Sequence, residues 1–109
     1  MNEVLKRPQV IRDLIDIATY IAENNLDNGE RFLCAAEETF KPLGQMPHIG
    51  KNCQFSNARL QSIRQLPVKE FRQYLIFYQV RLTGVEILRV IHGSRDIETI
   101  LEGDNNEDF

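Results

Sequence analysis

Two long apolar runs near the C-terminal end, FRQYLIFYQV and VEILRVIH, are separated only by the short segment RLTG. Both runs are rich in aromatic and β-branched residues, which favour strands that are covered on at least one face. Gly84 suits the turn that would fold one strand back on the other. The sequence therefore predicts a buried β-hairpin, and the end of this hairpin brings Arg89, His92, Arg95 and Asp96 to one place.

The N-terminal half of the chain carries two helical patterns. After a short predicted strand at Glu3–Arg7, Pro8 suits the first position of a helix, and apolar residues then recur at helical spacing through Ile21. The polar segment Asn24–Gly29 is predicted to end this helix, and a second apolar stripe begins at Phe32. Two antiparallel helices joined by a short loop are therefore expected.

Gly44, Pro47 and Gly50 predict a long surface loop that continues to about residue 57. A β-type pattern resumes at Arg59 and leads into the hairpin. The order of elements describes an α+β domain in which both helices pack on one face of a sheet. This single domain is expected to span residues 1–101.

Beyond the hairpin, residues Asp96–Leu101 predict a short C-terminal helix, and Ser94 is a plausible N-cap for it. The remaining segment, residues 102–109, is acidic and lacks apolar residues apart from its terminal Phe109. Segments of this composition do not bury enough apolar surface to fold. We therefore expect residues 102–109 to form a disordered tail.

Length and charge limit the classes of function. With 109 residues the chain has room for one core, and its net charge of −3 does not suggest a dedicated nucleic-acid binder. No apolar run approaches the ~18 residues of a membrane span, and the polar N-terminus lacks a signal-peptide core, so a cytoplasmic protein is expected. Cys34 and Cys53 lack zinc-type spacing and are predicted to be free thiols. Neither a metal nor a cofactor is expected.

Arg89 is a notable cation because it lies within an apolar strand. Strand alternation places it on one face and His92 on the other. A buried unpaired guanidinium is costly, so Arg89 is expected to pair with Asp13, Asp16 or Asp96, or to lie at an open sheet surface. For His92, a structural hydrogen bond and a catalytic role both remain open. The residues that share the predicted face of Arg89 are Val85, Ile87 and Ile91.

Three other cations are predicted to contact a target. Arg95 follows the last strand in a Gly-Ser loop, where solvent exposure and partner contact are both easy. Guanidinium groups recognise carboxylates and phosphates through forked hydrogen bonds. We therefore predict Arg59, Arg64 and Arg95 as target-binding residues, whereas packing is the favoured role for Tyr74 and Tyr78.

Four segments of the chain, in this order, resemble the RelE/ParE superfamily of bacterial toxins, on the ParE side. The resemblance covers residues 4–101 and implies a RelE/ParE-like fold, in which a helical hairpin packs on a small twisted antiparallel sheet. This agrees with the fold predicted from periodicity. The segments are DLIDIATYIA at Asp13–Ala22, MPHIGK at Met46–Lys51, QYLIFY at Gln73–Tyr78 and RVIHGSRD at Arg89–Asp96.

The resemblance implies the toxin of a type II toxin–antitoxin system, and the superfamily divides by target. ParE-like members inhibit DNA gyrase by binding, without catalysis, and this is the function expected here. RelE-like members cut messenger RNA on the ribosome, and Arg64, Arg89 and His92 would form the catalytic set under that alternative. A second alternative is a degenerate member that binds an antitoxin without being toxic.

The resemblance also implies an adjacently encoded, ParD-like antitoxin whose disordered part wraps the toxin. A helical hairpin on a small sheet offers a groove for an amphipathic helix and an open edge for an extended strand. Ile11, Ile15 and Ala22 are the predicted antitoxin contacts, although they could instead complete the core. DNA is expected to be bound only through the toxin–antitoxin complex.

Overall fold

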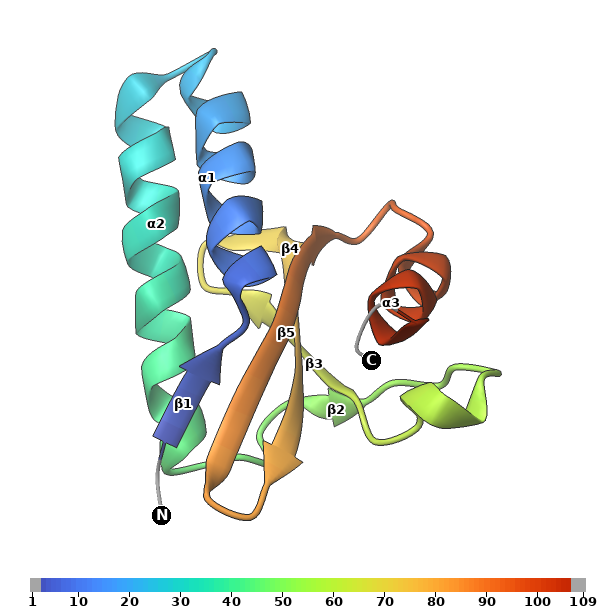
Figure 1. The fold of residues 1–109 in the computed structure, drawn as a ribbon. Coiled ribbons are helices and arrows are strands. Elements are labelled where there is room, and N and C mark those ends of the chain that lie inside the picture. The colour runs from blue at the N-terminus through green and yellow to red at the C-terminus, as the bar shows by residue number, and fades with distance from the viewer. Residues whose placement is uncertain (1–2, 107–109) are drawn as a thin grey trace.

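The computed structural model describes residues 3–106, and these residues form an α+β domain with a helical hairpin on one side of a five-stranded sheet (Figure 1). The predicted fold class is thereby confirmed. The elements are β1 (Glu3–Lys6), α1 (Pro8–Ala22), α2 (Leu26–Phe40), the 3-10 helix η1 (Lys41–Gly44), β2 (Lys51–Asn52), the 3-10 helix η2 (Ala58–Leu60), β3 (Arg64–Val68), β4 (Phe71–Arg81), β5 (Gly84–His92) and α3 (Ile97–Asn106).

The sheet has the strand order β1-β5-β4-β3-β2 and is mixed rather than wholly antiparallel. Strands β2 to β5 pair in antiparallel fashion, as predicted, whereas β1 pairs with β5 in parallel. In the drawing, β1 and β5 lie side by side and their arrows run in the same direction (Figure 1). The prediction of an all-antiparallel sheet is corrected for this pair.

The turn between the two helices is shorter than predicted. Helix α2 begins at Leu26, and the Asn25 side chain caps it by accepting a hydrogen bond from the Asn28 amide. Gly29 therefore lies inside α2 and does not break a helix. A Cβ at Gly29 would lie 2.9 Å from the Cβ of Ala22, so its glycine permits the close approach of α1 and α2.

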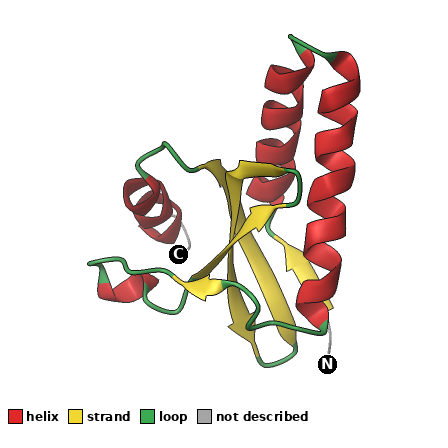
Figure 2. Ribbon diagram, turned by 180° about the vertical axis from the view of Figure 1, so that it is seen from behind, coloured by secondary structure: helices red, strands yellow, loops and turns green. Residues whose placement is uncertain are grey.

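Two apolar cores lie on opposite faces of the sheet. The helical hairpin lies on one side of the sheet and α3 on the other (Figure 2). The larger core packs α1 and α2 on one face, as the sequence predicted. The smaller core lies under α3 and η2 and was not predicted. The larger core includes Val10, Leu14, Phe32, Ala36, Phe40, Tyr78, Ile87 and Val90. The smaller core includes Cys53, Leu60, Ile63, Phe77, Leu88, Ile91 and Leu101.

The C-terminal helix differs from its prediction in its cap and its length. Asp96, rather than Ser94, accepts hydrogen bonds from the amide and hydroxyl of Thr99. Helix α3 continues through Asn106, so residues 102–106 of the predicted disordered tail are helical. Hydrogen bonds from Asn57 to Glu102 and from Arg89 to Asp104 hold this extension against the rest of the domain. Residues 107–109 of the predicted tail lie outside the described residues.

The segment before β3 is also more structured than predicted. Arg59 lies in the 3-10 helix η2, so the β-type pattern is wrong there and the strand begins only at Arg64. Leu60 and Ile63 are buried in the smaller core, which accounts for the apolar spacing that suggested a strand. Within the predicted long loop, β2 pairs with β3. None of the helices among residues 3–106 is long and apolar enough to cross a membrane.

Candidate functional site

A β-bulge in β5 determines where the functional side chains point. Phe77 pairs with Arg89, and Tyr78 pairs with Ile87, which leaves Leu88 without a register partner in the described sheet. The extra residue shifts the alternation of side chains by one position. Ile91 therefore faces the smaller core, opposite to Ile87, and the prediction that these two residues share a face is wrong.

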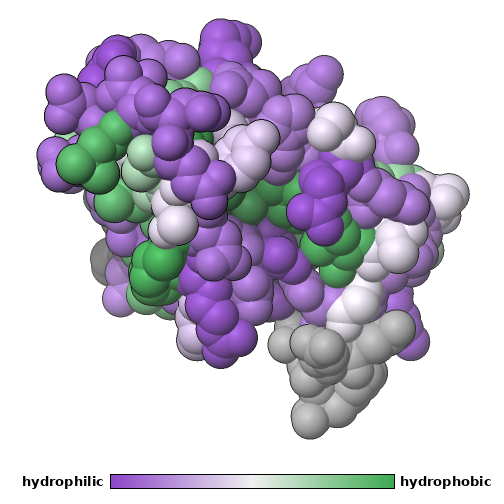
Figure 3. Space-filling view, turned by 90° about the horizontal axis from the view of Figure 1, so that it is seen from above, coloured by the Kyte–Doolittle hydropathy of each residue, from purple (hydrophilic) through white to green (hydrophobic). Residues whose placement is uncertain are grey.

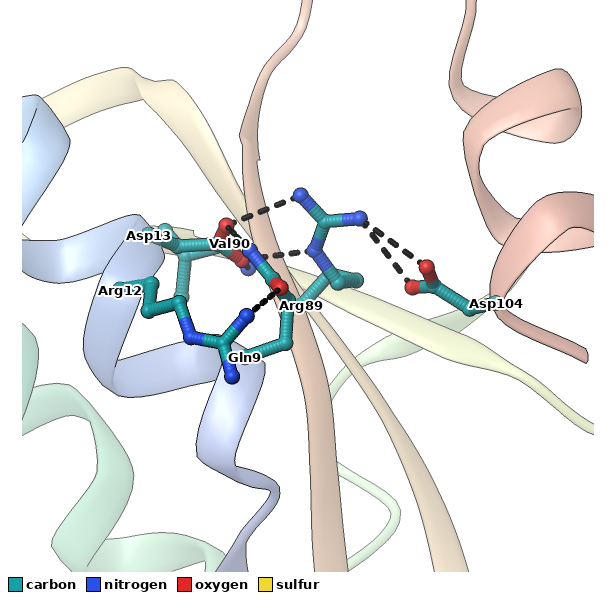
Figure 4. Close-up of polar contacts among 6 residues, drawn as sticks. All are labelled: Gln9, Arg12, Asp13, Arg89, Val90 and Asp104. Atoms are coloured by element: carbon teal, nitrogen blue, oxygen red, sulfur yellow. Dashed lines mark hydrogen bonds and ion pairs between the residues drawn. The ribbon is translucent and has the colours of Figure 1, made fainter. Parts of the chain in front are cut away.

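Arg89 joins three elements through two carboxylates (Figure 4). Its Nε and Nη2 donate hydrogen bonds to Asp13 of α1 over 2.8 and 2.9 Å. Its Nη1 donates to Asp104 of α3, with the shorter distance at 3.1 Å. The predicted pairing with Asp13 is confirmed. Asp104 was missed because the sequence assigned it to a disordered tail, and neither Asp16 nor Asp96 bonds Arg89 in the described structure.

Asp13 is the most heavily hydrogen-bonded carboxylate of this node. Only 6% exposed, it also accepts hydrogen bonds from the Val90 amide at 3.0 Å and from Gln9 Nε2 at 3.1 Å. The hydrogen bond to Asp13 is the largest cause that raises the pKa of Arg89 above its ordinary value, against the opposing effect of burial. Arg89 is thus a fixed cation whose charge is compensated by two acids.

A cleft of about 790 Å³ lies beside this node, between α1 and the segment that joins β5 to α3. Viewed from above, the surface shows an apolar hollow between the helical hairpin and α3, with hydrophilic residues around it (Figure 3). Arg89, His92 and Arg95 all line the cleft, in agreement with the prediction that the end of the hairpin brings them together. Asp96 does not line it, because it caps α3.

His92 is held at the end of β5 by two contacts. Its Nδ1 accepts a hydrogen bond from the Ser94 amide at 3.0 Å, which requires an unprotonated Nδ1. Its ring meets the ring of Tyr74 edge to face, with centroids 5.0 Å apart. Burial raises the pKa of Tyr74, so its hydroxyl stays protonated at neutral pH. These contacts fit the structural reading of His92 and leave its Nε2 as the nitrogen that carries the proton.

Arg64 and Arg59 lie outside the cleft that contains Arg95. Arg64 Nη1 donates to the carbonyl of Gly50 at 2.5 Å and to that of His48 at 3.3 Å. It therefore fixes the loop before β2. Arg59 is exposed in η2. The three predicted target-binding cations do not gather in one cleft.

The Tyr78 hydroxyl also holds the loop before β2 in place. It accepts a hydrogen bond from the Gly50 amide at 2.8 Å and donates one to the Pro47 carbonyl at 2.9 Å. A Cβ at Gly50 would lie 2.6 Å from this hydroxyl oxygen, so glycine is required for the contact. The sequence predicted packing for Tyr78 but gave no signal for its partners, since they lie about thirty residues away in the chain.

The predicted antitoxin-binding residues line one flank of the helical hairpin. Ile11 and Ile15 are exposed, Ile15 at 56%, whereas Ala22 is half-buried against Gly29. Leu26 and Leu33 of α2 are also exposed and were not predicted. Ile11 and Ile15 therefore do not complete the core, and their surface is available to a partner.

This arrangement is that of a small α+β domain with a helical hairpin on a mixed sheet and a cleft beside it that both polar and apolar residues line. A family model described as ParE toxin of type II toxin-antitoxin system, parDE, matches residues 4–97. The chain belongs to this family, which confirms the resemblance seen in its sequence.

A solved structure described as "Chromosomal ParDE TA system from P. aeruginosa" is similar to the chain in fold, with a TM-score of 0.68. The sequence identity is 18%, and the match covers 84% of this chain and 96% of the other. At this identity the likeness extends to the fold alone. The chain has no match among curated protein sequences.

Proposed function

We propose that this member of the ParE toxin family acts in the cytoplasm, inhibits DNA gyrase by binding, and is neutralised by a cognate antitoxin. The observation that carries the proposal is that two carboxylates already pair with Arg89. Its side chain is 16% exposed and its guanidinium binds both Asp13 and Asp104, so its charge is already compensated. A cation in this state is poorly suited to stabilising a developing phosphate charge.

The ribonuclease alternative requires Arg64, Arg89 and His92 to act together. Metal-free RNA cleavage needs a base, an acid and at least one available cation around a single phosphate. Only Arg89 and His92 share the cleft, while Arg64 bonds the carbonyls of the loop before β2. The shared cleft is the one feature that favours the ribonuclease, and a direct test must therefore include RNA cleavage.

The flank of the hairpin supports antitoxin binding. Ile11, Ile15, Leu26 and Leu33 expose apolar surface along α1 and α2, and helix-in-groove recognition uses surfaces of this kind. We propose that an amphipathic helix of the antitoxin covers them and that DNA is contacted only through the resulting complex. Ile15→Asp tests this placement, because Ile15 is exposed. The variant is expected to fold normally and to lose affinity for the antitoxin.

The function is tested by expressing the protein in bacterial cells that carry a DNA-damage reporter, while protein synthesis is followed by pulse labelling. Gyrase inhibition predicts early damage signalling with continuing translation. Immediate arrest of translation with cleaved messenger RNA and no damage signal would instead identify a ribonuclease. Unimpaired growth, together with retained antitoxin binding, would identify a degenerate member and refute the proposal.

A further inference from the structure

The cleft beside Arg89 combines an apolar floor with a charged rim. Ile17 and Ile100 are partly buried there and supply its apolar side chains, and Val90 and Ile91 of β5 also line it, with their side chains directed to opposite faces of the sheet. At the rim, the Tyr20 ring is 64% exposed and stands on α1. Exposed aromatic side chains above apolar pockets are typical of the centres of protein interfaces.

The positive and negative side chains that line the cleft are equal in number, and two of these side chains are available to pair with a bound partner. With His92 neutral, two aspartates and two arginines line it, so their formal charges sum to zero. Asp13 and Arg89 bond each other. Asp16 and Arg95 are exposed, and neither side chain makes a hydrogen bond or ion pair within the described residues. A cleft with no net positive charge lacks the attraction that nucleic-acid binding requires.

The cleft and the antitoxin-binding flank lie on opposite sides of α1. At 100° per residue, the cleft positions 9, 13, 16, 17 and 20 point roughly 160° away from positions 11, 15 and 22. The core positions, such as Val10 and Leu14, point between these two sides. A helix bound along Ile11 and Ile15 therefore leaves the opposite side of α1 uncovered.

We propose that this cleft is the docking site for a peptide segment of the toxin's protein target, and this inference rests on the function proposed above. The segment places an aromatic or branched apolar side chain on the floor, against Ile17 and Tyr20. A neighbouring carboxylate of the segment pairs with Arg95, and a neighbouring cation pairs with Asp16. The charge complementarity of the rim selects a peptide that carries both signs, and not a polyanion.

The test uses purified DNA gyrase and full-length protein made by cell-free synthesis, with supercoiling activity and direct binding as the two measurements. Tyr20→Ala and Arg95→Glu change exposed side chains and should leave the fold intact. Each is expected to weaken gyrase binding and inhibition by at least about tenfold. Lys41→Glu, a matched charge reversal at an exposed residue outside the cleft, is expected to inhibit as the wild type does. Ile15→Asp is also expected to inhibit normally while losing antitoxin affinity.

Three results would overturn the inference. Full inhibition by both cleft variants would show that the target docks elsewhere. Loss of antitoxin affinity in the cleft variants, with inhibition retained, would assign the cleft to the antitoxin. Binding of bare duplex DNA that Arg95→Glu abolishes would make the ligand a nucleic acid. Absence of gyrase inhibition by the wild type would refute the proposed function itself, which is a separate outcome.

Discussion

Replacing Asp13 with asparagine isolates the contribution of the Arg89 node to stability, because asparagine keeps the shape of the side chain and removes its charge. Asp13 is 6% exposed and receives two hydrogen bonds from Arg89 and one from the Val90 amide. Removing one partner of a buried ion pair costs about 3–5 kcal/mol. Arg89 retains Asp104, so the lower end of this range, about 3 kcal/mol, is expected.

For a domain of this size, such a loss corresponds to a decrease in Tm of about 10–20 °C. Thermal unfolding followed by circular dichroism, together with urea titration at neutral pH, measures it. Asp16→Asn is the matched control, since Asp16 is exposed on the same helix, and it is expected to change stability by less than about 0.5 kcal/mol.

A double-mutant cycle completes this test. The double variant Arg89→Met with Asp13→Asn removes both partners of the ion pair. Its loss of unfolding free energy should therefore be smaller than the sum of the losses in the two single variants. The expected coupling free energy is about 1–3 kcal/mol. A loss below about 1 kcal/mol in Asp13→Asn, or additive effects in the cycle, would contradict this prediction, because either result means that the charge of Asp13 does not hold Arg89.

Two further predictions concern acid stability and thiol reactivity. Burial raises the pKa of Glu86, but hydrogen bonds from Arg81 and Arg7 outweigh it and hold this pKa below the ordinary 4.5. The stability that Glu86 supplies is therefore present above pH 4.5 and lost as the pH falls through the lower folded-state pKa. The stability difference between wild type and Glu86→Gln should then shrink in urea titrations from about pH 6 to about pH 3, and a constant difference would contradict this. Burial raises the pKa of Cys53 to about 11, whereas Cys34 is exposed. Iodoacetamide should therefore alkylate Cys34 first in native protein, as read by mass spectrometry, and equal rates would contradict the burial of Cys53.

Sequence periodicity predicted the architecture because the helical hairpin and the β4–β5 hairpin are local structures. The apolar stripe from Val10 to Ile21 and the runs around Gly84 each predict one element without reference to the rest of the chain. The prediction for Gly29 was wrong because a glycine in a polar segment usually marks the end of a helix. Here Gly29 lies inside α2 and permits the close approach of the two helices. Such a role depends on a contact between elements.

The candidate site was predicted only where local pattern and electrostatics were sufficient. An arginine in an apolar strand must find an acid, so Asp13 was a predicted partner of Arg89. Asp104 was not, because composition alone assigned it to the tail, and composition gives no sign of the hydrogen bonds that Glu102 and Asp104 accept from Asn57 and Arg89 in the extended α3. The bulge at Leu88 depends on the register between two strands, which no single strand pattern reveals.

Gyrase inhibition is tested directly by a titration of purified DNA gyrase with antitoxin-free protein, in which binding and supercoiling are measured on the same samples. Inhibition of gyrase by binding predicts saturable binding and a loss of supercoiling over the same concentration range, with ribosome-bound messenger RNA left intact in a parallel reaction. Normal supercoiling in the presence of excess folded protein, accompanied by messenger RNA cleavage that His92→Ala abolishes, would contradict it.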